Sequence, residues 1–109
     1  MPELRAIGLY NRLAMTAANQ GRTADALEDL AMALRLARET KRPLLEAVSK
    51  NNMGLVYQMS GRLLQAATCF RLALDMAREA KGDAHPLSRI IRTNLERLPS
   101  TVPFARRAA

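Results

Sequence analysis

The chain has 109 residues, of which 49% are hydrophobic and 25% charged, values typical of a single globular domain. One cysteine and one histidine exclude a disulfide framework and a metal site of cysteine and histidine ligands, and no apolar run approaches the roughly 18 residues of a membrane span. The 17 basic and 10 acidic residues give a net charge of +7, and all of this excess lies in residues 41–109. The asymmetry favours an acidic partner; the alternative is that it only keeps the protein soluble.

Alanine, leucine, arginine and methionine dominate the sequence, so we expect an all-α, cytoplasmic protein. Apolar residues at helical spacing predict five helices, at about 3–20, 23–41, 44–60, 63–80 and 86–98. Gly21 and Gly61 are predicted to end the first and third helices in the left-handed conformation. Pro43 separates the second helix from the third, and Pro86 suits the first position of the fifth. Residues 99–109 are expected to form a loosely ordered tail.

An internal repeat organises these helices into pairs. Residues 11–40 align with residues 51–80 without a gap, and nine of the 30 positions are identical. Each copy is predicted to be two helices around a glycine, and a single hairpin of this kind cannot bury its apolar face alone. We therefore predict one domain over 1–98, composed of repeat one (4–42), repeat two (44–82) and a capping helix (86–98).

The small and aromatic residues of each copy resemble those of the tetratricopeptide-repeat family. Repeat two matches all six family positions, which are Gly54, Tyr57, Gly61, Ala66, Phe70 and Ala73. Repeat one matches four of the six, and its residues there are Ala14, Ala17, Gly21, Ala26, Leu30 and Ala33. Repeat one has lost the aromatic residues, with Ala17 and Leu30 in their places, and Lys50 occupies the place of the family's signature tryptophan. The resemblance implies a right-handed α-solenoid of two helix-turn-helix hairpins with a C-terminal capping helix.

The repeat period is longer than the family's usual one, since equivalent asparagines recur from Asn11 to Asn51 and from Asn52 to Asn94. This period is similar to that of the long-repeat subgroup found in kinesin light chains and many bacterial regulators. The run 51–54 (Asn-Asn-Met-Gly) resembles an asparagine-rich run of that subgroup, residues 82–86 resemble its inter-repeat loop, and Thr93-Asn94-Leu95 resembles the opening of a third repeat. Because two repeats are close to the minimum for stability, we also expect self-association through the open solenoid faces or a longer parent protein.

The family resemblance implies a function in binding protein or peptide partners. First helices of successive repeats line a concave groove, where asparagines bond the backbone of a ligand. Carried over position by position, the implied groove residues are Asn11, Arg12, Met15, Asn51, Asn52, Leu55, Gln58, Met59, Thr93, Asn94 and Arg97. The alternative for the asparagines is that they bond only the neighbouring helix. Arg12 and Arg97 are suited to form ion pairs with carboxylates of a ligand. The alternative is that both side chains are only solvated.

Neither catalysis nor a cofactor or metal has support in the sequence, so we expect no enzyme. The resemblance explains His85 as part of a loop, and Cys69 is expected to be a small buried hydrophobic residue. The alternative function is nucleic-acid binding, with Arg89, Arg92 and Lys81 on one side of the last helix. This alternative lacks a stacking platform, because Tyr57 and Phe70 are required by the core.

Overall fold

The computed structural model describes residues 1–103, and over these residues the chain forms five α-helices and no strand. The helices are α1 (Pro2–Asn19), α2 (Thr23–Glu39), α3 (Pro43–Met59), α4 (Leu63–Lys81) and α5 (Pro86–Glu96). Each bound lies within two residues of the one expected from periodicity and turn residues, which confirms the all-α prediction. Pro86 is the first residue of α5, as its missing N–H predicts.

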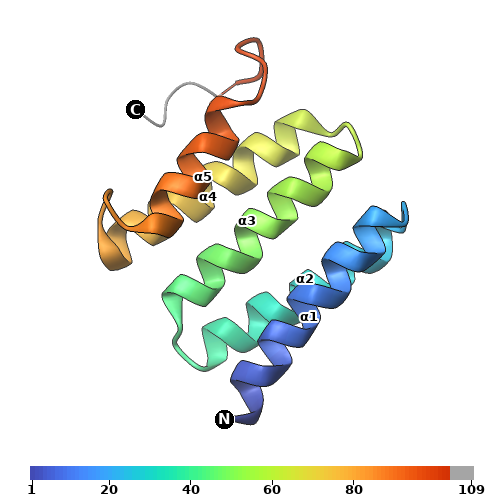
Figure 1. The fold of residues 1–109 in the computed structure, drawn as a ribbon, viewed down its shortest axis with the longest axis vertical. Helices are drawn as coiled ribbons and strands as arrows, with labels where there is room; N and C mark the ends of the chain where they lie inside the picture. Colours follow the sequence, from blue (N-terminus) through green and yellow to red (C-terminus); the bar gives the residue numbers. More distant parts are fainter. Residues whose placement is uncertain (104–109) are drawn as a thin grey trace.

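The helices pack as two hairpins followed by a single helix. Helix α1 packs on α2 and α3 on α4, while α3 also packs on α2 and α5 packs on α4. Figure 1 shows α3 crossing the middle of the molecule, between the α1/α2 hairpin and the end formed by α4 and α5. The shortest dimension is 17 Å, which corresponds to two layers of helices. The fold is thus a short tetratricopeptide-like solenoid.

The three short loops between the first four helices have the same conformation. In each, a left-handed residue (Gly21, Lys41 or Gly61) has its N–H bonded to the carbonyl three residues earlier. The arginine that follows bonds the carbonyl five residues earlier, at 2.8–2.9 Å. This pair of bonds is the Schellman motif. Lys41, with φ 55°, occupies a position at which a residue with a Cβ costs about 1–2 kcal/mol.

Small residues at equivalent places allow the helices of each hairpin to approach closely. Ala26, Ala33, Ala66 and Ala73 are completely buried. Gly54 of α3 lies against the ring of Phe70 of α4, so closely that a Cβ on Gly54 would lie 2.5 Å from two ring carbons. The close packing follows from residue size, because a larger side chain at these positions would separate the backbones.

Helix α5 covers the exposed end of the second hairpin. Its buried residues Ile91 and Leu95 join the core cluster that contains Phe70, and Leu98 extends this contact beyond the helix. Residues 99–103 form turns, in which Val102 packs against the same cluster. The rest of the expected tail, residues 104–109, lies outside the described part of the chain.

Candidate peptide-binding site

The eleven residues implied by the family resemblance lie on the first helix of each repeat and on the capping helix. Helix α1 carries Asn11, Arg12 and Met15; α3 carries Asn51, Asn52, Leu55, Gln58 and Met59; α5 carries Thr93 and Asn94, with Arg97 directly after its last residue. These segments are far apart in the sequence, so they contribute to one surface only if α1, α3 and α5 lie side by side. Hydrogen bonds between asparagines show that they do.

The first link joins α1 to α3. The Nδ2 of Asn52 donates to the Oδ1 of Asn11 at 2.8 Å. The Nδ2 of Asn11 donates to the Oγ of Ser49 at 3.2 Å and to the carbonyl of Ile7 at 2.9 Å. Ser49 is fully buried, so the bond from Asn11 gives its hydroxyl a partner inside the fold. Asn11 is therefore an interhelical bridge as well as a surface residue.

The second link joins α3 to α5. The Nδ2 of Asn94 donates to the Oδ1 of Asn51 at 3.0 Å, and Asn51 is only 6% exposed. Asn52 and Asn94 are half-buried, and the Oδ1 of each accepts no hydrogen bond from residues 1–103. The bonds to neighbouring helices hold both amides in place and leave their carbonyl oxygens able to accept an N–H from a bound backbone.

The remaining predicted residues differ in how much surface they offer. Met15 and Leu55 are half-buried and pack against core clusters, and Gln58 is also half-buried. Met59 is 51% exposed, and Arg12 and Arg97 are exposed. Exposed methionine and arginine side chains give an adaptable surface with positive charge at its two ends.

A shallow hollow of about 390 Å³ brings three of these residues together at α5. It is lined by Thr93, Asn94 and Arg97, together with Arg89 and Ile90. Ile90 is 55% exposed, and sequence reasoning missed it as a site residue. The sequence contains one signal that could have identified it: Ile90 lies four residues before Asn94, which places its apolar side chain on the same helix face.

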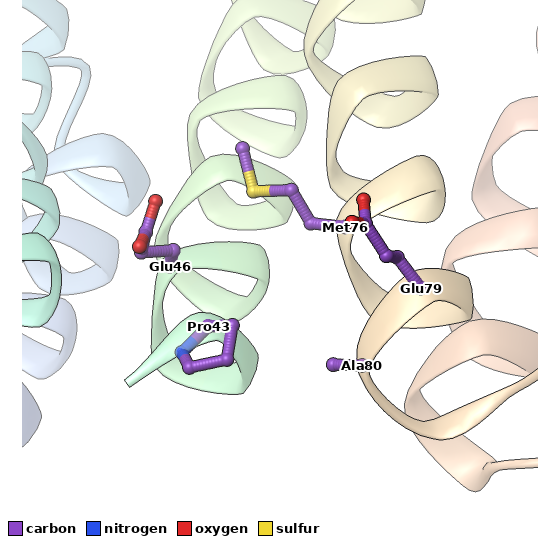
Figure 2. A pocket seen from close by; sticks show the side chains of 5 residues that line it. All are labelled: Pro43, Glu46, Met76, Glu79 and Ala80. Atoms are coloured by element: carbon purple, nitrogen blue, oxygen red, sulfur yellow. The ribbon is translucent and has the colours of Figure 1, made fainter. Parts of the chain in front are cut away.

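Two further hollows lie where α3 begins and α4 ends, and neither was expected from the sequence. The α3–α4 hollow, about 380 Å³, is lined by Pro43 and Glu46 of α3 and by Met76, Glu79 and Ala80 of α4, as Figure 2 shows. The basic hollow, about 590 Å³, is lined by Lys41, Arg42, Pro43, Leu44, Leu45, Ala80 and Lys81. A fourth hollow lies beside Tyr57 and Cys69. The side chains around the α3–α4 hollow come from the two ends of the second repeat, which explains why no local motif marks it.

The loop before α5 is held by charge and by a histidine cap. Arg78 and Arg92 both bond the carboxylate of Asp83, and they lower its pKa below the ordinary value, the bond from Arg78 having the larger effect. The Nδ1 of His85 accepts the N–H of Leu87 at 3.1 Å, so His85 caps α5, in keeping with the loop role expected for it. Of the three basic residues proposed for nucleic acid, Arg92 is thus already occupied by an acidic group.

Chemically reactive groups do not gather anywhere in the described residues. Within 1–103 no three side chains of histidine, cysteine, aspartate or glutamate are placed to hold a metal ion. Cys69 is buried, as expected, and burial raises the pKa of its thiol despite the nearby charge of Lys50. None of the helices in this part of the chain has the length and apolar character needed to cross a membrane.

Comparison with known proteins agrees with the geometry. Neither the curated proteins nor the solved structures offer a match to this chain. The family model described as tetratricopeptide repeat matches residues 5–78, which is both hairpins up to the last turn of α4 and more than half of the chain. The helix pairs, the turn glycines and the small buried residues also occupy the family's positions. The chain therefore belongs to the tetratricopeptide-repeat family.

Proposed function

We propose that the protein is a non-enzymatic adaptor that binds a peptide or helix of a partner protein across α1, α3 and α5. Tetratricopeptide repeats are in general protein–protein interaction modules, so the broad function follows from the family. The proposal adds the surface, with Asn52 and Asn94 accepting backbone N–H groups and Leu55 and Met59 providing apolar contact. The long repeat resembles that of bacterial regulators, and we extend the proposal to a regulatory role in the cytoplasm of a bacterium.

The proposal is supported above all by the Asn94 side chain. Its Nδ2 is held 3.0 Å from the Oδ1 of the buried Asn51, at the edge of the hollow that also contains Ile90 and Arg97. The Oδ1 of Asn94 accepts no bond from the described residues. A polar group fixed in orientation beside an apolar and a cationic side chain can bind a backbone while its neighbours select the side chains.

Two substitutions that break the same hydrogen bond provide the test. Asn94→Ala removes the surface amide, whereas Asn51→Ala removes its buried partner and leaves the surface amide in place. Wild type and both variants, checked for folding by circular dichroism, are used as baits in nuclease-treated lysate of the source cells, and captured proteins are quantified by mass spectrometry.

We expect one protein to be captured by wild type, captured more weakly by Asn51→Ala, in which the Asn94 amide is present but no longer held, and lost with Asn94→Ala. Equal capture by all three baits would move the interface to another face of the molecule. Loss with both variants would mean that the asparagine pair acts only through the packing of α5. Capture that requires intact nucleic acid would favour the nucleic-acid alternative.

A further inference from the structure

The basic hollow combines apolar and positively charged lining residues. The apolar ones are Pro43, Leu44 and Leu45 of α3 and Ala80 of α4, and the cations are Lys41, Arg42 and Lys81. At about 590 Å³ it is the largest of the hollows described above. It lies at the beginning of α3 and the end of α4, apart from the asparagines that link α1, α3 and α5.

The three cations of the basic hollow have no carboxylate partner among residues 1–103. Among residues 1–103 the Nη2 of Arg42 donates only to the Sδ of Met1, at 3.3 Å, and thioether sulfur is a weak acceptor. Other arginines of the protein do have acidic partners, such as Arg38, which bonds Glu46 at 3.4 Å. The three cations around this hollow therefore form no ion pair within the described residues and are available to an anionic group.

Lys41 provides a second, independent observation. The same Schellman turn occurs three times, and the left-handed position is glycine in the other two, Gly21 and Gly61. A lysine at φ 55° is strained where glycine would not be. A strained residue that lines a hollow is typical of a functional position rather than a structural one.

The neighbouring α3–α4 hollow determines which end of a bound ligand can carry negative charge. The two hollows adjoin each other, since both are lined by Pro43 and Ala80. The α3–α4 hollow is lined by two carboxylates, Glu46 of α3 and Glu79 of α4 (Figure 2), and of these Glu46 is already paired with Arg38. An acidic group is attracted at the Lys41 end and repelled at the Glu79 end.

We propose that the basic hollow is a second binding site, which takes an acidic segment of a partner protein that carries an aliphatic side chain. The carboxylates face Lys41, Arg42 and Lys81, and the aliphatic group covers Leu44 and Leu45. The part of the segment that continues past Ala80 is neutral or basic, because Glu79 repels a carboxylate there. The apolar lining residues favour a peptide with an aliphatic side chain over a sugar-phosphate backbone, which has no aliphatic group to cover them.

A selection from phage-displayed random peptides on the immobilised protein tests the proposal. The enriched peptide is synthesised with a fluorescent label, and its Kd is measured by polarisation. We expect acidic peptides with leucine, isoleucine or valine. Lys41→Gly and Lys81→Gln should each weaken binding about three- to fivefold, the size of one partly exposed ion pair, while Lys50→Gln serves as a charge-matched control with no effect.

Two measurements keep the outcomes distinct. Lys41→Gly is expected to relieve the strained turn, and its melting temperature, measured beside the Kd, separates lost binding from unfolding. Titration of the peptide into ¹⁵N-labelled protein should shift the amide signals of Leu45 and Ala80. Absence of any enriched peptide, enrichment without acidic residues, equal affinity for the lysine variants, or shifts confined to α5 around Asn94 would each overturn the proposal. Displacement of the peptide by a random oligonucleotide would reassign the hollow to nucleic acid.

Discussion

Replacing Gly54 with alanine should destabilise the protein, although alanine is the better helix former. An ideal Cβ on Gly54 lies 2.5 Å from Cδ1 and Cε1 of Phe70 and 3.1 Å from Cγ, whereas carbon atoms in contact are normally about 3.5–4.0 Å apart. The ring is completely buried, so it has no solvent side to move into.

The magnitude follows from two opposing effects. Forcing one extra methyl group into a packed core costs about 1–3 kcal/mol, while exchanging glycine for alanine inside a helix gains about 1 kcal/mol. Because the clash at Gly54 involves a buried ring and falls about 1 Å short of normal contact, we expect the packing cost to prevail by about 1–2 kcal/mol. For a domain of this size the melting temperature should fall by roughly 5–10 °C.

The protein itself contains the compensating pair. At the equivalent positions the first hairpin has Ala14 and Leu30 instead of glycine and phenylalanine, and both residues are completely buried in one core cluster. Gly54→Ala combined with Phe70→Leu recreates that pair, so the double variant should be at least about 1 kcal/mol more stable than the sum of the single changes predicts.

Thermal unfolding followed by circular dichroism measures all of these variants. Gly8→Ala is the matched control, since a Cβ there meets only the end of the Arg12 side chain, at 3.3 Å, and a flexible side chain can move. We expect Gly8→Ala to be neutral or stabilising. A Gly54→Ala protein that melts at or above the wild-type temperature would refute the close approach of α3 and α4 on which the reasoning depends.

Three further predictions concern charge, reactivity and backbone strain. Because its arginine partners lower the pKa of Asp83 in the folded state, the carboxylate stabilises the fold above about pH 4, its ordinary range, and this effect is lost as the pH falls through the lowered value. Asp83→Asn should therefore lower the melting temperature at neutral pH and have no effect in strong acid; an equal effect at both would contradict the ion pairs. Cys69, with a pKa raised by burial, should react with iodoacetamide more slowly in the native than in the denatured protein, and equal rates by thiol titration would contradict its burial. Lys41→Gly should raise the melting temperature by about 2–5 °C, since relief of about 1–2 kcal/mol of strain exceeds the added entropy of the unfolded glycine; unchanged or lower stability would show that the turn is unstrained.

Sequence patterns predicted the helices and their turns well because these depend on local chemistry. Gly21 and Gly61 end helices because glycine adopts a left-handed conformation at little cost, and the structure confirms φ values of 76° and 80° at these residues. The turn at Lys41 has the same geometry but could not be predicted, because lysine carries no signal for that conformation. The hydrogen bonds of the surrounding helices impose it.

The candidate site could be predicted only in part. The family positions place Asn52 and Asn94 on the first helices, but a single sequence does not distinguish an asparagine that meets a ligand from one that bonds a neighbouring helix. That choice depends on the separation of α1, α3 and α5, which brings Asn52 within 2.8 Å of Asn11 and Asn94 within 3.0 Å of Asn51. The partial burial of Met15 and Leu55 likewise follows from how the helices pack.

The sequence by itself determined the helical class, the repeat and the positions of the small residues, because periodicity, glycine and proline act over a few residues. Only the tertiary structure decided which side chains share a surface. Lys41 and Lys81 are far apart in the sequence, yet they line one hollow because the α3/α4 hairpin returns the end of α4 to the beginning of α3. Charge and apolar surface combine into a binding site through this return of the chain, and no local pattern records it.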